Sequence, residues 1–137
     1  MDYTNAKDSE WYINTNVTYA YASGAVTGSY GTATAKALTD VLYTAEDETA
    51  GLGTEGDIKT AGLKTEHKRR INANANSLLQ ETDWYVIRAA DGGTAVPSNV
   101  ATYRAAVRTK ANEHTTAIDN AADVDALAAL TFTWPTL

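Results

Sequence analysis

Residues that recur at every third or fourth position, most of them apolar, mark two segments in the second half of this 137-residue chain. The first set is Leu63, His67, Ile71, Asn74 and Leu78. The second set is Val100, Tyr103, Val107, Ala111, His114 and Ile118, and it follows Pro97-Ser98, where the serine is expected to cap a helix. Such spacing places each set on one face of an α-helix. We therefore predict two helices, joined by residues 82–96 with a turn at Asp91-Gly92-Gly93, that pack as an antiparallel hairpin.

The predicted hairpin contains few bulky side chains, because alanine and threonine are abundant and the chain has one phenylalanine and one methionine. Trp84 and Trp134 are therefore expected to fill the space that alanine leaves. A short third helix is predicted over residues 122–130, carrying Val124, Leu127 and Leu130. The ending at 131–135 alternates apolar and polar residues and predicts an extended tail.

The first third of the chain has a β pattern. Larger apolar residues alternate with polar ones from Trp11 to Tyr21, which predicts one strand with a buried and a solvated face. Ser23-Gly24 then predicts a turn, with a second strand or turn at 25–30, whereas 32–43 fits a short helix or a strand. The acidic, glycine-punctuated stretch from 45 to 62 is typical of a solvated loop.

These patterns together predict an α+β fold: a small β-rich N-terminal part followed by a C-terminal antiparallel helical hairpin. The expected organisation is a β-rich part at 1–45, an acidic linker containing glycine at 46–62, and a hairpin domain at 63–137.

Composition excludes several kinds of chemistry. Without cysteine the chain has no disulfides, thiolate metal sites or cysteine nucleophile. The net charge of −6 argues against nucleic acid as a partner, because phosphate binding depends on Lys and Arg. The polar start differs from a signal peptide, and no apolar run approaches the roughly 20 residues that span a bilayer. We therefore expect no membrane partner and a protein that acts where it is made.

Catalytic motifs are also missing, since the sequence has no Gly-x-Ser-x-Gly elbow, His-Glu-x-x-His pair or phosphate loop. Gly51-x-Gly53-x-x-Gly56 resembles a glycine-rich phosphate-binding loop only loosely, because no strand and helix frame it. We therefore expect a protein that is not an enzyme and needs no cofactor. A small hydrolase or metal-dependent enzyme is the less favoured alternative.

Three local alternatives remain beside this interpretation. The acidic stretch could form a calcium loop, although the ligand spacing of an EF-hand is missing. His67 and His114 could face one another and share a metal, although such sites usually need three or four ligands. The basic run at 67–70 could dock an acidic partner, although charge runs on helices usually face solvent.

Three spaced elements in the second half stand out together. They are Leu78-Leu79-x-x-Thr82-Asp83-Trp84, Tyr103-Arg104-x-x-Val107-Arg108, and Trp134-Pro135 near the end. Over residues 63–136 this arrangement resembles the C-terminal domain of phage tail assembly chaperone and tail fibre assembly families. Similar segments are also familiar from virion structural proteins of marine tailed phages. The sequence departs from the chaperone pattern at Val107, where leucine is usual, and in an alanine-rich insertion at 117–130.

The resemblance implies a tailed-phage protein located in the virion, or in the host cytoplasm during assembly. The expected function is a structural component of the tail, neck or fibre; the alternative is a transient tail or tail fibre assembly chaperone not retained in the virion. Partners would be other phage structural proteins or further copies of the chain. The residues expected to pack the motif or bind a partner are Leu79, Thr82, Asp83, Trp84, Tyr103, Arg104, Arg108, Trp134 and Pro135.

Physical reasoning assigns a structural role to most of these residues. Thr82 and Asp83 can bond exposed backbone groups where the first helix ends, and either Arg104 or Arg108 can pair with Asp83. Trp84 is expected to close over the hairpin, opposite Tyr103. If it does, truncating Trp84 to alanine would cost about 3–5 kcal/mol and unfold the hairpin.

Overall fold

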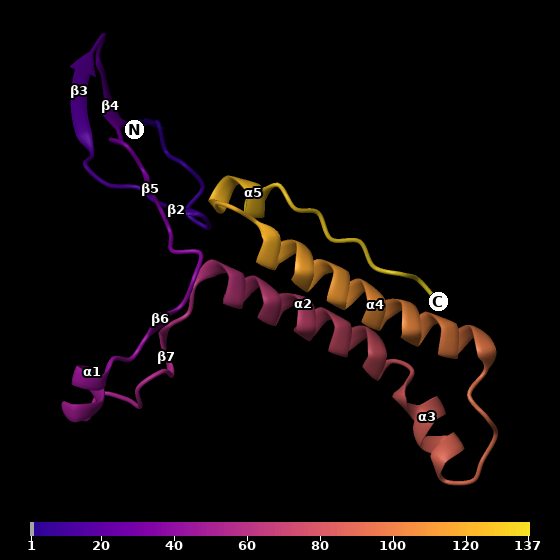
Figure 1. The fold of residues 1–137 in the computed structure, drawn as a ribbon. Coiled ribbons are helices and arrows are strands. Elements are labelled where there is room, and N and C mark those ends of the chain that lie inside the picture. The colour runs from indigo at the N-terminus through magenta and orange to yellow at the C-terminus, as the bar shows by residue number, and fades with distance from the viewer. Residues whose placement is uncertain (1) are drawn as a thin grey trace. The chain divides into compact units, whose positions relative to one another are not determined.

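A computed structural model describes residues 2–137 and confirms the predicted α+β class, with small sheets in the N-terminal part and helices in the C-terminal part (Figure 1). The strands are β1 (Asp2–Thr4), β2 (Tyr12–Ile13), β3 (Thr18–Ala22), β4 (Ala25–Ser29), β5 (Thr34–Ala35), β6 (Val41–Leu42) and β7 (Ile58–Thr60). The helices are α1 (Ala45–Thr49), α2 (Leu63–Gln80), α3 (Asp83–Ala90), α4 (Ser98–Asn120) and α5 (Val124–Ala128).

The chain divides into two compact units. The first comprises Met1–Leu63 together with Asp123–Ala128, and the second comprises Lys64–Ala122 together with Ala129–Leu137. The acidic segment 46–62, expected to be a linker between domains, therefore lies within the first unit. Helix α5 also belongs to the first unit, where the Tyr12 hydroxyl donates a hydrogen bond to Asp125.

The prediction of one continuous strand from Trp11 to Tyr21 is wrong. It is split into β2 and β3, and Asn16 between them adopts a left-handed conformation with φ of 58°. β2 pairs with β5, whereas β3 pairs with β4 in a sheet of order β1-β4-β3. Every residue of β3 is exposed, so the predicted buried face is also absent there. Alternation indicates which residues share a face, but burial requires a second layer.

The turn at Ser23-Gly24 is confirmed. Both residues have positive φ angles, 52° and 79°, as a two-residue hairpin turn requires. The second strand is also confirmed as β4, where Gly28 is buried beneath the Tyr3 ring. A Cβ at Gly28 would lie 2.8 Å from that ring, so only glycine allows this approach. The ambiguous stretch 32–43 forms the short strands β5 and β6 rather than a helix.

The acidic stretch is more ordered than the predicted loop. Thr44 and Asp47 form a capping box at the start of α1, and β7 pairs antiparallel with β6. Asp47 also receives a hydrogen bond from the Lys59 ammonium group at 2.8 Å, and Glu48 accepts one from the Glu55 backbone at 3.1 Å. These two carboxylates therefore have partners within the segment, whereas a calcium loop would direct its carboxylates at an ion.

The Asp47–Lys59 contact gives the first testable prediction. The hydrogen bond from Lys59, followed by that from the Thr44 backbone, lowers the pKa of Asp47 below its usual value. A lowered pKa in the folded state stabilises the fold above the unfolded-state pKa, and this contribution is lost as pH falls through the folded-state pKa. Lys59→Met should therefore raise the pKa of Asp47, measured by carbon-detected NMR titration. Lys36→Met is the control and should leave it unchanged, because Lys36 binds the Ser9 carbonyl instead.

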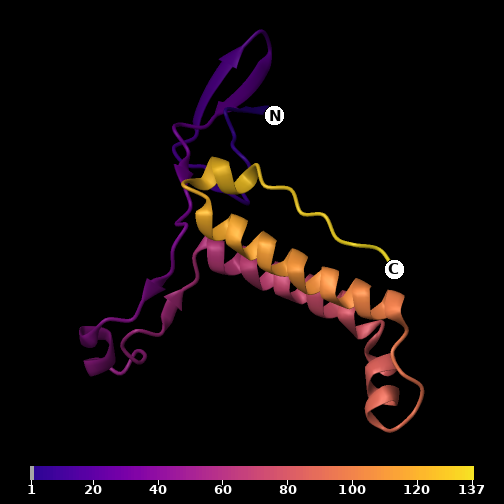
Figure 2. The same cartoon turned by 45° about the vertical axis from the view of Figure 1, so that its right-hand side comes forward.

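In the second unit, α2 and α4 lie side by side and antiparallel, which confirms the predicted hairpin (Figures 1 and 2). Lys64 and Lys68 near the start of α2 both reach Asp119 at the end of α4, at 2.8 Å to its backbone oxygen and side chain respectively. All six residues of the stripe predicted on the second helix are buried. Val107 and Ile118 are the most enclosed residues of α4, so the core of this unit follows the predicted face.

Three details of the predicted hairpin are wrong. Asn74 is exposed and Ala75 is buried in its place, because the packed face of α2 contains His67, Ile71 and Ala75. Ser98 is the first residue of α4 rather than its cap, and the N-cap position is held by Pro97, which has no side-chain donor or acceptor. The connection over 82–96 contains the eight-residue helix α3.

The third predicted helix is shorter than the 122–130 expected. It is confined to α5, where Val124 and Leu127 are buried, while Leu130 lies beyond its end. The tail from 131 to 135 has no helix or strand, in agreement with an extended ending. Figures 1 and 2 both show the tail running alongside α4, within the second unit. Across residues 2–137, no helix combines the length and the apolar character needed to cross a membrane.

Candidate functional site

The guanidinium group of Arg104 connects two of the three sequence elements. Arg104 is buried in α4, and its Nη1 donates to the Leu79 carbonyl and to the Thr82 hydroxyl, each at 2.7 Å. Its Nη2 lies 2.9 Å from an Asp83 carboxylate oxygen. The structure thus selects Arg104, and not Arg108, as the partner of Asp83. We call Arg104, Leu79, Thr82 and Asp83 the arginine clasp.

The arginine clasp lies where α2 ends and α3 begins. Helix ends leave carbonyl groups without a partner in the helix, and the Leu79 carbonyl accepts from the Thr82 backbone at 3.1 Å and from its hydroxyl at 3.0 Å. Arg104 adds a charged donor to the same oxygen. Asp83 occupies the first turn of α3, where the helix dipole stabilises a negative charge. The clasp therefore sets the direction in which α3 leaves the hairpin.

Trp84 does not close over the hairpin. Its side chain is 50% exposed, and the guanidinium carbon of Arg88 lies 4.9 Å from its ring centroid. Ile87 is 67% exposed, and Val86 is also exposed. The expectation that Trp84 closes over the hairpin is therefore wrong, and the condition for a loss of about 3–5 kcal/mol on Trp84→Ala is not met. We call Trp84, Val86 and Ile87 the α3 apolar surface.

Sequence reasoning missed Val86 and Ile87 as candidate residues. The signal was present in the run Trp84-Tyr85-Val86-Ile87, because four consecutive apolar residues on a helix point in different directions and cannot all enter one core. The predicted connection over 82–96 hides this signal, because a loop has no regular faces along which apolar residues can be compared. Sequence reasoning also missed Arg88, whose guanidinium carbon lies 5.5 Å from the Tyr85 ring centroid.

The predicted turn at Asp91-Gly92-Gly93 is confirmed, and in the structure it follows the end of α3. Gly92 has a φ of 80°, and the backbone of Gly93 donates to the Arg88 carbonyl at 2.9 Å. A Cβ at Gly93 would lie 2.8 Å from this carbonyl oxygen. Gly92 therefore adopts a left-handed conformation that other residues rarely adopt, and Gly93 allows a close backbone approach that a Cβ would block.

The third sequence element lies along α4, away from the arginine clasp. The Nε2 of buried His114 lies 2.9 Å from the Thr133 carbonyl oxygen, which can only accept, so Nε2 carries the proton. The rings of Phe132 and Trp134 meet the imidazole edge-on, with centroids 5.0 and 5.2 Å away. The half-buried Trp134 thus helps to hold the extended tail on the helix.

The remaining predicted residues lie in different surroundings. Tyr103 is buried in the hairpin core, and Pro135 is half-buried in the tail. Arg108 is exposed on α4, one turn beyond Arg104. The nine predicted residues therefore separate into the arginine clasp with adjoining Trp84, the tail at Trp134-Pro135, the core position of Tyr103, and the surface position of Arg108.

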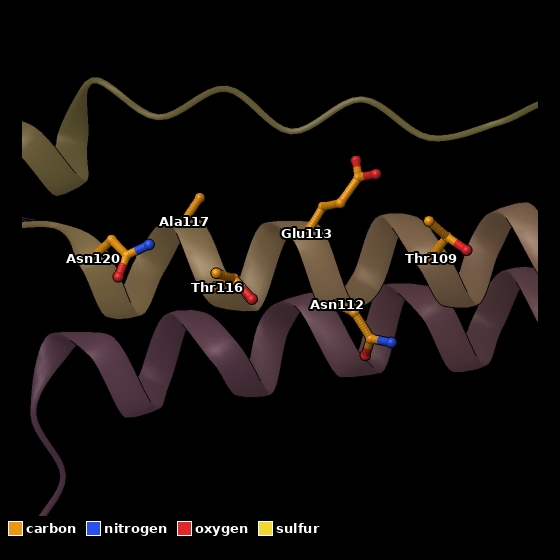
Figure 3. Close-up of a pocket in the computed structure, with 6 residues that line it drawn as sticks. All are labelled: Thr109, Asn112, Glu113, Thr116, Ala117 and Asn120. Atoms are coloured by element: carbon orange, nitrogen blue, oxygen red, sulfur yellow. The ribbon is translucent and has the colours of Figure 1, made fainter.

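An open hollow runs along one face of α4, where the chain presents hydroxyl, amide and carboxylate groups (Figure 3). It is lined by Thr109, Asn112, Glu113, Thr116, Ala117 and Asn120. Its single carboxylate, Glu113, accepts a hydrogen bond from Lys110 at 2.6 Å, and this contact lowers the pKa of Glu113. A carboxylate held in its ionised form, with no second acid or base among the lining residues, does not make an acid–base pair.

The two histidines are not level in the hairpin. Lys64 and Lys68, on either side of His67 in the sequence, both contact Asp119, so this part of α2 lies near the end of α4. His114 precedes Asp119 by five residues, which is about 7.5 Å along the axis of α4. Among residues 2–137, no group of three or more His, Cys, Asp or Glu side chains is placed to hold a metal ion. The predicted possibility of a shared metal therefore has no geometric support.

The basic run at 67–70 is engaged largely within the hairpin. His67 is buried, Lys68 binds Asp119, and Arg69 lies 2.6 Å from Glu66 one turn earlier. These contacts give the run a role in helix pairing and local charge balance.

Comparison of the chain with protein-family models, curated proteins and solved structures found no match.

Proposed function

We propose that the chain is a non-enzymatic structural component of a tailed-phage virion, in the tail, neck or fibre. On this proposal it acts by contacting neighbouring virion proteins and by remaining in the finished particle. The observation that carries the proposal is the α3 apolar surface, held by the arginine clasp at the point where the resemblance to phage assembly proteins is strongest.

The chemistry of the α3 apolar surface supports a protein partner. Trp84 and Ile87 are three residues apart and share one side of α3, and exposed apolar residues grouped in this way are typical of protein–protein contact sites. Tryptophan, tyrosine and arginine also contribute most often to the binding energy of such sites, and Trp84, Tyr85 and Arg88 occur together here. The buried clasp orients α3, so a partner would meet a pre-formed surface and pay less ordering entropy.

The first unit favours retention in a particle over transient binding. Its exposed large apolar side chains include Tyr3, Ile13, Tyr19, Tyr21, Val26, Val41, Leu42, Leu52 and Ile58. A permanent assembly would cover such surfaces, as obligate interfaces do. A factor that is released after each round of assembly would instead expose them again each time. This observation supports the structural role over the alternative of a transient tail or tail fibre assembly chaperone.

Mass spectrometry of purified virions tests the proposal. We expect the chain in particles of the phage that encodes it, at a fixed ratio to the other tail, neck or fibre proteins. Finding it in infected cells during assembly but not in purified particles would contradict the structural role and favour the chaperone alternative. Finding it in neither would contradict both.

Trp84→Ala provides the second test. Because Trp84 is half exposed, we expect the free energy of unfolding to fall by only about 1 kcal/mol, while incorporation into particles falls several-fold. Chemical denaturation measures the first quantity and quantitative mass spectrometry of virions the second. Arg108→Ala is the control, since it removes an exposed side chain from α4 and should change neither. Normal incorporation of the Trp84 variant would contradict a role for the α3 apolar surface.

A further inference from the structure

The outer edge of β3 is open within its sheet. Among residues 2–137, the strand order β1-β4-β3 leaves β3 with one neighbour, and its Tyr19 and Tyr21 side chains are 61% and 75% exposed. Natural proteins usually protect such an edge with lysine, proline or a bulge, because its backbone groups can pair with another strand. The edge sequence Thr18-Tyr19-Ala20-Tyr21-Ala22 contains neither lysine nor proline, and its pairing with β4 is regular.

The hairpin geometry determines which backbone groups face outward. In a hairpin with a two-residue turn, the residues that flank the turn exchange hydrogen bonds, and these are Ala22 and Ala25. Hydrogen-bonded pairs alternate along the ladder, so Ala20 and Thr18 also direct their backbone groups toward β4. The N–H and C=O groups of Tyr19 and Tyr21 therefore point away from β4, along the open edge.

We propose that β3 pairs antiparallel with β3 of a second copy of this chain, about a twofold axis at Ala20. This register places Tyr19 opposite Tyr21 of the second copy, and both residues have their free backbone groups on that edge. The two tyrosines of each strand share one face of the sheet, so the contact forms two cross-strand aromatic pairs. Ala20 meets Ala20 of the second copy at the axis, where small side chains allow close approach. The sequence is thus self-complementary, as a twofold interface requires.

Charge favours a second copy as the occupant. The chain has a net charge of −6, so two copies repel each other over most of their surfaces. Residues 11–35 contain no Asp, Glu, Lys or Arg, and β3 lies within this uncharged segment. Pairing at β3 therefore brings two acidic chains together without opposing any like charges. A strongly basic partner, which an acidic chain would otherwise attract, finds no carboxylate on this edge.

The packing of the hairpin also favours an added strand. Gly28 is the only buried residue among those of β3 and β4, and the aromatic cover of this sheet is provided by tyrosines. Tyr19 interacts with strand β1, because its side chain forms a hydrogen bond with that of Tyr3, and this bond raises the pKa of Tyr19. Pairing would join two three-stranded sheets into one of six strands, with the tyrosines of both β3 strands on one face. Larger sheets with an apolar face are more stable than short isolated hairpins.

Variants of the full-length chain that place charged residues at Tyr19 and Tyr21 test the register. We expect wild-type protein to show a concentration-dependent dimer in sedimentation equilibrium. Tyr19→Lys with Tyr21→Lys places lysine opposite lysine and should raise the dimer dissociation constant by about tenfold or more, as should the double glutamate variant. Mixing the two variants places lysine opposite glutamate and should restore a heterodimer. NMR contacts between Ala20 and Thr27 would verify that the hairpin persists in each variant.

Three results would overturn the proposal. A wild-type chain that stays monomeric to millimolar concentration has no such contact. A double lysine variant that dimerises as well as wild type uses another surface. Open-ended aggregates without a discrete dimer are incompatible with a twofold contact, because that contact consumes the β3 edges of both copies. None of these results bears on the presence of the chain in virions, which mass spectrometry measures separately.

Discussion

Arg104→Met is expected to lower the free energy of unfolding by about 2–4 kcal/mol, because hydrogen bonds to a charged group are among the stronger polar contacts in proteins. Methionine retains much of the aliphatic packing but loses the bonds to Leu79, Thr82 and Asp83. Thr82 is almost fully buried, so water replaces the lost donor poorly. Chemical denaturation monitored by circular dichroism measures the change.

Two controls separate the arginine clasp from general charge effects. Arg108→Met removes the same group from an exposed position of the same helix and should change stability by no more than about 0.5 kcal/mol. Asp83→Asn should cost about 0–1 kcal/mol, because its carboxylate is nearly half exposed and water can solvate the clasp there. Equal stability of the Arg104 and Arg108 variants would contradict the role of the clasp.

Ile118→Ala is expected to have an effect of similar size or larger, about 2–5 kcal/mol, as truncation of a fully buried aliphatic residue usually does. The Ile118 side chain is 0% exposed, and it lies on the face of α4 that forms the hairpin core. Few other bulky residues are present to collapse into the resulting cavity, since this core also contains Ala75 and Ala111. Thermal and chemical denaturation measure the loss.

Ile87→Ala is the matched control for this cavity. It makes the same chemical change at a position that is 67% exposed on α3, so we expect a change within about 0.5 kcal/mol. If Ile87→Ala proved as destabilising as Ile118→Ala, the α3 apolar surface would be part of the core and unavailable to a partner. The pair of variants therefore tests the core and the proposed docking surface together.

The proposed function and the proposed β3 contact draw on different surfaces. The α3 apolar surface belongs to the second unit, and the open edge of β3 to the first. A variant impaired at one surface should therefore retain the other function in isolation.

The sequence predicted the hairpin because its signals are local. Helical periodicity identified α2 and α4, and the stripe on α4 agrees with the structure at each of its six positions. Glycine chemistry identified the turns at Ser23-Gly24 and Asp91-Gly92-Gly93 for the same reason, since positive φ angles are a property of individual residues. Charge spacing narrowed the partner of Asp83 to two arginines, one helical turn apart on α4.

Only the tertiary structure decided which arginine forms the clasp and whether Trp84 is buried. Both depend on how far α3 turns away from the hairpin, and this direction is set by contacts between Arg104 on α4 and the end of α2. The docking of the tail on His114 is likewise a contact between distant residues, which no periodicity in either segment indicates. A tryptophan has the same neighbours in sequence whether it fills a core or faces solvent, and its environment is fixed by elements that meet only in the folded chain.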